Sequence, residues 1–251
     1  MIAEVISVGT ELLLGQITDT NATTIAQRLA ASGFDAHFRV TVGDNEARME
    51  EAIRTACSRS DVVIITGGIG PTPDDITKRV LAGLASVPLV RDEAHEALLY
   101  DRVMAQRGVV LDNVLQMADV PQGAEALPND NGAALGLAMD IDGARVFSLP
   151  GVPAEMQLML DRHVMPWLRD ASQGAVVESV VVRTAGRGES EIAHLLDAMY
   201  AKTNPSLAFL IAGDEVHVRI TAKAVGTRLA ASMLQPVEAE VRQILGDAVL
   251  D

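Results

Sequence analysis

A single loop, Thr66–Asp75 (TGGIGPTPDD), contains most of the residue types that could bind or cleave a phosphate compound. Its glycines Gly67, Gly68 and Gly70 have no Cβ, so a ligand can approach their backbone N–H groups closely. The pair Thr72-Pro73 predicts the N-cap and first position of a helix, whose free N–H groups would also face a phosphate. Because the loop matches neither the Walker A pattern nor the G-x-G-x-x-G fingerprint, it predicts a phosphate site of another kind.

The loop ends in two adjacent carboxylates, Asp74 and Asp75. In the first turn of a helix, each would stabilise the helix by about 0.3–1 kcal/mol without any ligand. Beside a phosphate they would repel the ligand unless a divalent cation lay between them, as Mg²⁺ does in many phosphate sites. We therefore expect Asp74 and Asp75 to hold Mg²⁺, Mn²⁺ or Co²⁺, with Asp44 as a third ligand or, equally, as a helix N-cap. Lys78, one turn later, is expected to neutralise phosphate charge.

Two other loops are expected at the same edge of the sheet, because ligands of open parallel sheets bind beyond the carboxyl ends of the strands. Thr10 and Glu11 follow the first expected strand, and Pro150 and Gly151 follow a later one. These four residues are candidate ligand contacts, and Glu155 in the next helix is expected to point toward the ligand. For the second loop, a plain strand-to-helix connection is the alternative interpretation.

Alternating strand and helix patterns in the first half of the chain predict an α/β fold. Apolar runs typical of buried parallel strands occupy residues 3–8, 34–42 and 61–66. Helical spacing of apolar residues covers 21–32, 46–58, 74–85 and 92–107. Strands separated by helices predict three layers, with a mostly parallel sheet covered by helices on both faces.

The pattern changes after residue 133. Asp142-Gly143 between two apolar runs predicts a β-hairpin, and an amphipathic helix is expected over 153–169. Small polar residues at 170–174 predict a joint that divides the chain into domains 1–169 and 175–251. The second domain shows the order strand, helix, strand, strand, helix, so it is expected to be a small α+β domain.

The composition argues against several classes of function. A formal net charge of −14 disfavours nucleic-acid binding, which needs Lys and Arg to neutralise phosphates. No apolar run reaches the roughly 20 residues of a membrane helix, and no targeting segment is visible, so a cytoplasmic protein is expected. Cys57, on a helical apolar stripe, is expected to be a core thiol. The five histidines show no metal-ligand spacing.

Several segments together resemble the CinA family (competence/damage-inducible protein A). They are SVGTELLLGQ at 7–16, DTN at 19–21, VGD at 42–44, TGGIGPTPDDIT at 66–77, LPGVPAEM at 149–156 and, in the second domain, GRGESEI at 186–192. The TGG-x-GPTPDD-x-T string is long and specific, and the resemblance spans nearly the whole chain.

The resemblance implies a molybdopterin-binding fold of the MoaB/MogA type for the first domain and a small KH-like second domain. In molybdopterin enzymes of that fold, acidic residues matching Asp44 and Asp75 serve catalysis. In CinA proteins the domain is similar to a metal-dependent ADP-ribose pyrophosphatase, which yields AMP and ribose 5-phosphate. The resemblance also favours a homo-oligomer. Longer family members carry a domain that deamidates nicotinamide mononucleotide, an activity not expected of a chain ending at Asp251.

Two departures from the family pattern keep other interpretations open. The family's N-x-x-G is present at 129–132 and makes Asn131 a candidate ligand contact, but the hydroxyl and proline that usually follow are replaced at Ala133 and Leu135. Where the family tends to have Arg-Lys, this chain has Val114-Leu115. The leading hypothesis is a metal-dependent hydrolase of ADP-ribose or a relative such as FAD. The alternatives are a non-catalytic nucleotide- or pterin-binding protein and an enzyme of molybdopterin-cofactor biosynthesis.

The second domain is not expected to bind RNA. RNA-binding KH domains clamp the nucleic-acid backbone with a G-x-x-G loop, and Gly186-Arg187-Gly188 does not provide one. Residues 176–251 contain seven Lys and Arg against ten Asp and Glu, which disfavours an RNA partner. A structural or dimerisation role is expected instead.

Overall fold

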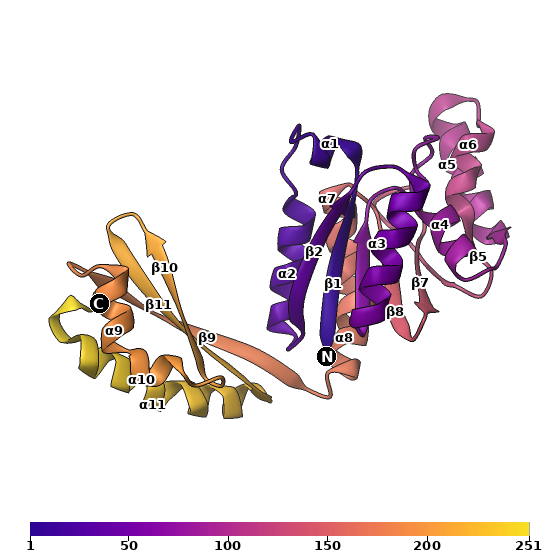
Figure 1. The fold of residues 1–251 in the computed structure, drawn as a ribbon. Helices are drawn as coiled ribbons and strands as arrows, with labels where there is room; N and C mark the ends of the chain where they lie inside the picture. Colours follow the sequence, from indigo (N-terminus) through magenta and orange to yellow (C-terminus); the bar gives the residue numbers. More distant parts are fainter. Residues whose placement is uncertain (251) are drawn as a thin grey trace. The chain divides into compact units, whose positions relative to one another are not determined.

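The computed structural model describes residues 1–250, which form two units (Figure 1). The first comprises Met1–Leu29 and Phe34–Leu168, and the second comprises Ala30–Gly33 and the chain from Arg169 onward. Each unit has its own apolar core. The last helix of the first half, α8 (Met165–Ala171), includes the first two residues of the expected polar joint, so only 172–174 lie between it and the next strand.

A six-stranded sheet forms the middle layer of the first unit, in the order β2-β1-β3-β8-β7-β6. Its strands are β1 (Ile2–Val8), β2 (Asp35–Val42), β3 (Val62–Thr66), β6 (Glu125–Leu127), β7 (Gly136–Ile141) and β8 (Ala144–Leu149). The pairs among β2, β1, β3 and β8 are parallel, whereas β7 and β6 add an antiparallel edge. Asp142 and Gly143 both have positive φ in the β7–β8 turn. The predicted mostly parallel sheet and its hairpin are confirmed.

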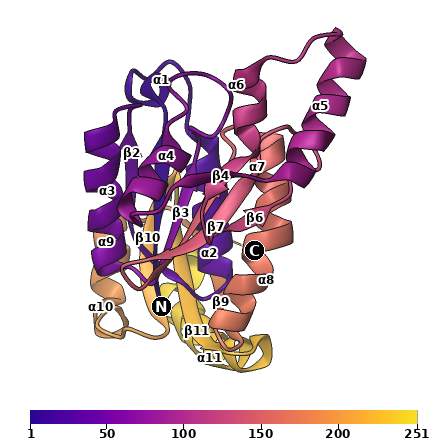
Figure 2. The same cartoon turned by 90° about the vertical axis from the view of Figure 1, so that its right-hand side faces the viewer.

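Helices cover both faces of this sheet. Helix α2 (Thr20–Ala31) leads from β1 outward to β2, whereas α3 (Glu46–Arg59) leads from β2 back across β1 to β3. Because crossovers in such sheets share one hand, the two helices lie on opposite faces. Figure 2 shows α3 and α4 (Thr77–Leu84) on one side of the sheet and α7 (Pro153–Met159) and α8 on the other.

The core of the first unit follows the predicted apolar stripes. Met49, Ile53 and Leu81 of α3 and α4 pack with Ile6 and Ile65 of the sheet. On the other face, the Trp167 ring of α8 lies edge-on to Phe147 of β8. The expected helix 153–169 forms with a π-helical interruption at η2 (Leu160–Val164). Cys57 is buried, and burial raises the pKa of its thiol to about 11, as a core thiol requires.

Residues 92–118 form an arm between two short paired strands. It consists of α5 (Glu93–Arg107), α6 (Asp112–Leu115) and η1 (Gln116–Ala118), and β4 (Leu89–Arg91) pairs antiparallel with β5 (Asp119–Pro121) at its base. The apolar spacing predicts α5, but strands of three residues are too short for periodicity to reveal. Val114 and Leu115, where the resemblance implies cations, pack against an apolar cluster that includes Ile69, Leu99 and Met117.

The second unit is a three-stranded antiparallel sheet with helices against it. The sheet order is β10-β11-β9, and the elements are β9 (Ala175–Ala185), α9 (Glu189–Leu195), α10 (Asp197–Tyr200), β10 (Ser206–Ala212), β11 (Glu215–Val225), α11 (Thr227–Leu245) and η3 (Gly246–Ala248). The predicted β-α-β-β-α order is confirmed, with the first helix split in two. Within residues 1–250, no helix combines the length and hydrophobicity that a membrane crossing needs.

Candidate functional site

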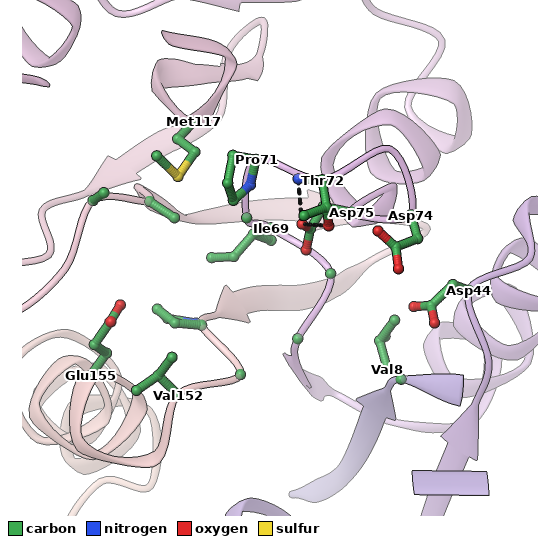
Figure 3. Close-up of a pocket in the computed structure, with 18 of the residues that line it drawn as sticks. Val8, Asp44, Ile69, Pro71, Thr72, Asp74, Asp75, Met117, Val152 and Glu155 are labelled. Carbon is green, nitrogen blue, oxygen red and sulfur yellow. Dashed lines mark hydrogen bonds between the residues drawn. The ribbon is translucent and has the colours of Figure 1, made fainter. Parts of the chain in front are cut away.

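A cavity of about 440 Å³ opens at the carboxyl ends of the parallel strands (Figure 3). Its walls come from the loops after β1, β2, β3 and β8 and from residues near 117, 133 and 155: Val8, Gly9, Glu11, Asp44, Gly67, Gly68, Ile69, Gly70, Pro71, Thr72, Asp74, Asp75, Met117, Ala133, Ala134, Pro150, Gly151, Val152 and Glu155. Most of the predicted site residues are therefore brought together. Thr10, Lys78 and Asn131 are not among the lining residues.

The helix predicted to begin at Pro73 begins instead at Thr77. The cause is a closed turn at the end of the loop. Asp75 Oδ2 accepts hydrogen bonds from the Thr72 backbone N–H at 2.8 Å and from the Thr72 hydroxyl at 2.5 Å, while the Asp75 N–H donates to Thr72 O at 3.0 Å. These bonds close residues 72–75 into a separate turn, and α4 begins two residues after it. No helix N-terminus at Pro73 faces the ligand.

Fewer N–H groups of the glycine loop are available to a ligand than the sequence predicts. The Gly67 N–H donates to Leu149 O at 3.0 Å, which joins the ends of β3 and β8, so it is not available to a phosphate. The N–H groups of Gly68, Ile69 and Gly70 have no hydrogen-bond acceptor within residues 1–250. Because these amides border the cavity, they are the donors that a ligand oxygen would meet.

Thr77, which the sequence reasoning did not single out, holds this loop in place. Its N–H donates to Gly68 O and its hydroxyl donates to Gly67 O, both at 2.9 Å. Gly68 has φ +69°, and a Cβ there would lie 2.3 Å from Thr77 Oγ1. Only glycine fits both the backbone conformation and this close approach. The last threonine of the TGG-x-GPTPDD-x-T string was the available signal.

The adjacent carboxylates Asp74 and Asp75 have different environments. Asp75 is engaged in the turn with Thr72, whereas Asp74 faces the same side of the cavity as Asp44 (Figure 3). The pKa of Asp74 is lowered from its ordinary value by the nearby Thr72 hydroxyl and by its own backbone N–H, so it is ionised at neutral pH.

Thr10 positions Asp44 rather than lining the cavity. It begins α1 (Thr10–Leu13), and its N–H and hydroxyl donate to Asp44 Oδ2 at 2.9 and 2.8 Å. The neighbouring Glu11 does line the cavity, as expected. The loops after β1 and β2 are thus joined, and the Asp44 carboxylate is oriented by two donors from another loop.

The expected three-carboxylate metal site is not assembled. Among residues 1–250, no three His, Cys, Asp or Glu side chains are spaced to hold a metal ion by themselves. Asp75 is engaged by Thr72, whereas Asp44 and Asp74 lie on the same side of the cavity and form the pair best placed to share a cation. Mg²⁺ is commonly held by one or two carboxylates together with substrate phosphates, so this donor set fits a cation bound jointly with a ligand.

Lys78 lies behind the glycine loop and does not face the cavity. Its side chain is buried, its Nζ donates to Met117 O at 2.7 Å, and burial lowers its pKa to about 8. It borders a second cavity of about 310 Å³ that shares Ile69, Gly70, Thr72 and Asp75 with the first. Lys78 ties η1 to α4, and its predicted contact with a phosphate is not one that the main cavity provides.

At the far end of the cavity, Glu155 is held by a buried amide. Asn129 Nδ2 donates to Glu155 Oε2 at 2.7 Å and to Ala134 O at 3.2 Å. Asn129 was not singled out, although it opens the N-x-x-G match. Asn131, which the sequence predicts to contact the ligand, does not line the cavity. Its backbone N–H donates to Asn129 Oδ1 at 3.2 Å.

The charge of the cavity is one-sided. Five carboxylates line it, from Glu11, Asp44, Asp74, Asp75 and Glu155, and none of its lining residues in the described chain is Lys, Arg or His. A bare phosphate in this cavity would be repelled, so a phosphate ligand needs an accompanying cation.

Comparison with known proteins defines the class. A probable molybdopterin binding domain matches residues 4–170, and a damage-inducible protein CinA KH domain matches residues 179–250. The first unit thus belongs to the probable molybdopterin binding domain family, and the second is KH-like. With both domains present in this order, the chain belongs to the CinA family.

Individual relatives agree with this assignment. A competence-damage inducible protein of Clostridium beijerinckii is 41% identical over 99% of this chain, and one of Caldicellulosiruptor bescii is 43% identical over 99%. The chain spans 61% of the length of each of these relatives. The crystal structure of CinA, with unknown function, from Thermoplasma acidophilum is 33% identical, with a TM-score of 0.61 over 65% of this chain and 96% of that one.

Proposed function

We propose that the first unit is a metal-dependent nucleotide pyrophosphatase that hydrolyses ADP-ribose, or a related dinucleotide such as FAD, to AMP and a sugar phosphate. The observation that carries the proposal is the pairing of unengaged loop amides with two carboxylates across one cavity. The amides of Gly68, Ile69 and Gly70 suit phosphate oxygens, and Asp44 and Asp74 suit a divalent cation. A diphosphate would bind the loop amides through its oxygens and the cation through its charge.

In this reaction, water adds to one phosphorus and the bridging P–O bond breaks, which leaves one phosphate on each product. Asp44 and Asp74 would hold the cation, and Thr10 and Thr72 would keep the surrounding loops in position. The cation, when bound, would neutralise phosphate charge and make water a better nucleophile. The loop amides would bind the equatorial oxygens, where negative charge is spread in the transition state.

The experiment is hydrolysis of ADP-ribose and FAD by the purified chain with Mg²⁺, Mn²⁺ or Co²⁺ and with EDTA. Release of AMP is expected only with a divalent cation, and it is expected to be lost in Asp44→Asn. Asp101→Asn, an exposed carboxylate of the α5 arm outside the cavity, is the matched control and should retain activity. AMP release that is unchanged in EDTA would contradict the proposal.

A second candidate function is binding of a nucleotide or pterin without turnover. It is favoured by Val114 and Leu115, which pack against an apolar cluster at the two positions where the resemblance implies cations. The same experiment separates the two candidates. Nucleotide that raises the melting temperature in the presence of Mg²⁺, without any AMP release, would support binding alone.

A further inference from the structure

We infer that Glu155 recognises the heterocyclic base of the ligand by accepting N–H donors from an amino-bearing ring, such as an aminopurine or an aminopteridine. The inference rests on the proposed function, from which it takes the diphosphate to lie at the glycine loop. Glu155 lies at the end of the cavity away from Asp44 and Asp74 (Figure 3). It is therefore where the other end of such a ligand would lie.

The Glu155 carboxylate is held in a fixed orientation. Asn129 is 4% exposed, and both of its amide hydrogens are used, one on Ala134 O and one on Glu155 Oε2. Its Oδ1 accepts the Asn131 N–H. Because every polar atom of Asn129 has a partner, it does not contact the ligand itself. It is a positioning residue that sets the orientation of Glu155.

Gly132 leaves the space that the carboxylate occupies. A Cβ at Gly132 would lie 2.0 Å from Glu155 Oε2 and 2.5 Å from Asn129 Nδ2. Any other residue there would displace the carboxylate or break its bond to Asn129. By contrast, Glu155 Oε1 has no hydrogen-bond partner in the described part of the chain, so one acceptor oxygen is available to a ligand.

The neighbours of Glu155 suit a flat ring and not a phosphate. Val152, Met117, Ala133 and Ala134 border the same cavity with apolar atoms, and Figure 3 shows Val152 next to Glu155. A ring can pack against these side chains, whereas a phosphate beside an ionised carboxylate would be repelled. The order of a bound ligand follows, with the diphosphate at the glycine loop and the base at Glu155.

The chemistry of a carboxylate decides which rings fit. An ionised carboxylate only accepts hydrogen bonds, and Asn129 has no hydrogen left to give. A ring that presents an amino group or a ring N–H therefore gains a charge-assisted hydrogen bond. A ring that presents only a nitrogen lone pair is repelled, because two acceptors face one another.

The test is the affinity of three nucleotides, measured by titration calorimetry in Mg²⁺. AMP and GMP carry amino groups, whereas purine riboside 5′-monophosphate has the same sugar, phosphate and ring without any amino group or ring N–H. The wild-type chain is expected to bind AMP and GMP at least about tenfold more tightly than the amine-free nucleotide, the factor given by one charge-assisted hydrogen bond.

Substitutions then assign this difference to Glu155. Glu155→Leu removes the acceptor at similar volume and is expected to erase the difference. In Glu155→Gln the one remaining oxygen accepts the hydrogen bond from Asn129, so an amide N–H would face the ligand and the preference for AMP should also be lost. Glu51→Leu, at an exposed glutamate outside the cavity, is the matched control and should leave it unchanged. Equal affinities in the wild type, no binding of any of the three, or a difference that persists in Glu155→Leu would each overturn the inference.

None of these measurements requires turnover. If the base preference is found but ADP-ribose is not hydrolysed, the inference holds and the proposed pyrophosphatase activity fails. If ADP-ribose is hydrolysed and the amine-free nucleotide binds as tightly as AMP, the activity stands and the role of Glu155 is wrong.

Discussion

The two ends of the cavity differ in the side chains that line them and in the contacts that hold those side chains. At one end, Asp44 and Asp74 stand beside loops held by backbone amides and threonine hydroxyls at the carboxyl ends of parallel strands. At the other end, a single carboxylate, Glu155, stands among apolar side chains and depends on one buried amide. From this difference we infer that the first end binds the charged part of a ligand and that the second selects among ligands.

The largest effect is expected from separating the two adjacent aspartates. Asp74→Asn should lower hydrolysis of ADP-ribose by at least about 100-fold with a smaller loss of stability than Asp75→Asn, because Asp74 lines the cavity and the two hydrogen bonds that Thr72 donates go to Asp75. Asp75→Asn should lower the free energy of unfolding by about 1.5–3 kcal/mol, because it weakens the bonds to Thr72. Kinetics and urea unfolding of both variants check this. Equal losses of stability would refute the distinction.

The glycine loop is expected to tolerate no side chain at Gly68. Gly68→Ala combines a left-handed backbone with a clash against Thr77 Oγ1, and should cost roughly 3 kcal/mol of stability. Gly108→Ala is the matched control, because Gly108 has nearly the same φ, +70°, and open space around its Cβ position. It should cost only about 1–2 kcal/mol. Melting temperatures that fall equally would show that the close approach of Thr77 is unimportant.

Lys78 predicts a pH dependence of stability. Its pKa is about 8 in the folded chain and 10.5 in the unfolded chain, so between these values the unfolded state binds more protons. The contribution of Lys78 to stability therefore rises with pH, by about 2 kcal/mol between pH 7.5 and 9.5. Urea unfolding of the wild type and of Lys78→Met at both pH values measures it, since other titrating groups are common to the two. A difference between the chains that does not change with pH would contradict this.

The smallest effect is expected where the α5–α6 arm touches the loop. Asn113 Nδ2 donates to Pro71 O at 3.1 Å across an exposed boundary. Asn113→Ala should raise the KM for ADP-ribose by about two- to threefold, as expected for one solvent-exposed hydrogen bond, and leave kcat unchanged. A large loss of kcat would mean that the arm contributes to the reaction and not only to the placement of the loop.

The sequence predicts the fold better than the orientation of the site. Apolar periodicity and the Asp142-Gly143 turn predict the parallel sheet, its hairpin and the second unit, because these patterns are local. The residues of the glycine loop are also correctly placed around one cavity. The start of α4, however, depends on the bonds between Thr72 and Asp75, which compete with the helix that Thr72-Pro73 favours.

Long-range contacts explain the other failures. Lys78 lies on the buried side of α4, where its ammonium group donates a hydrogen bond to the Met117 carbonyl, 39 residues away. The Thr10 hydroxyl donates to Asp44, 34 residues away, and the Gly67 N–H donates to Leu149 O. Motif spacing cannot show which polar groups of a loop are engaged by other loops. It indicates where a site lies and leaves open which atoms face the ligand.

We propose that the cavity holds a diphosphate only together with a divalent cation. Binding of the non-hydrolysable α,β-methylene analogue of ADP-ribose, measured by calorimetry with Mn²⁺ and with EDTA, tests it most directly. The carboxylate-lined cavity predicts binding with Mn²⁺, loss of that binding in EDTA, and its weakening in both Asp44→Asn and Asp74→Asn. Equal affinity with and without the cation would contradict the account.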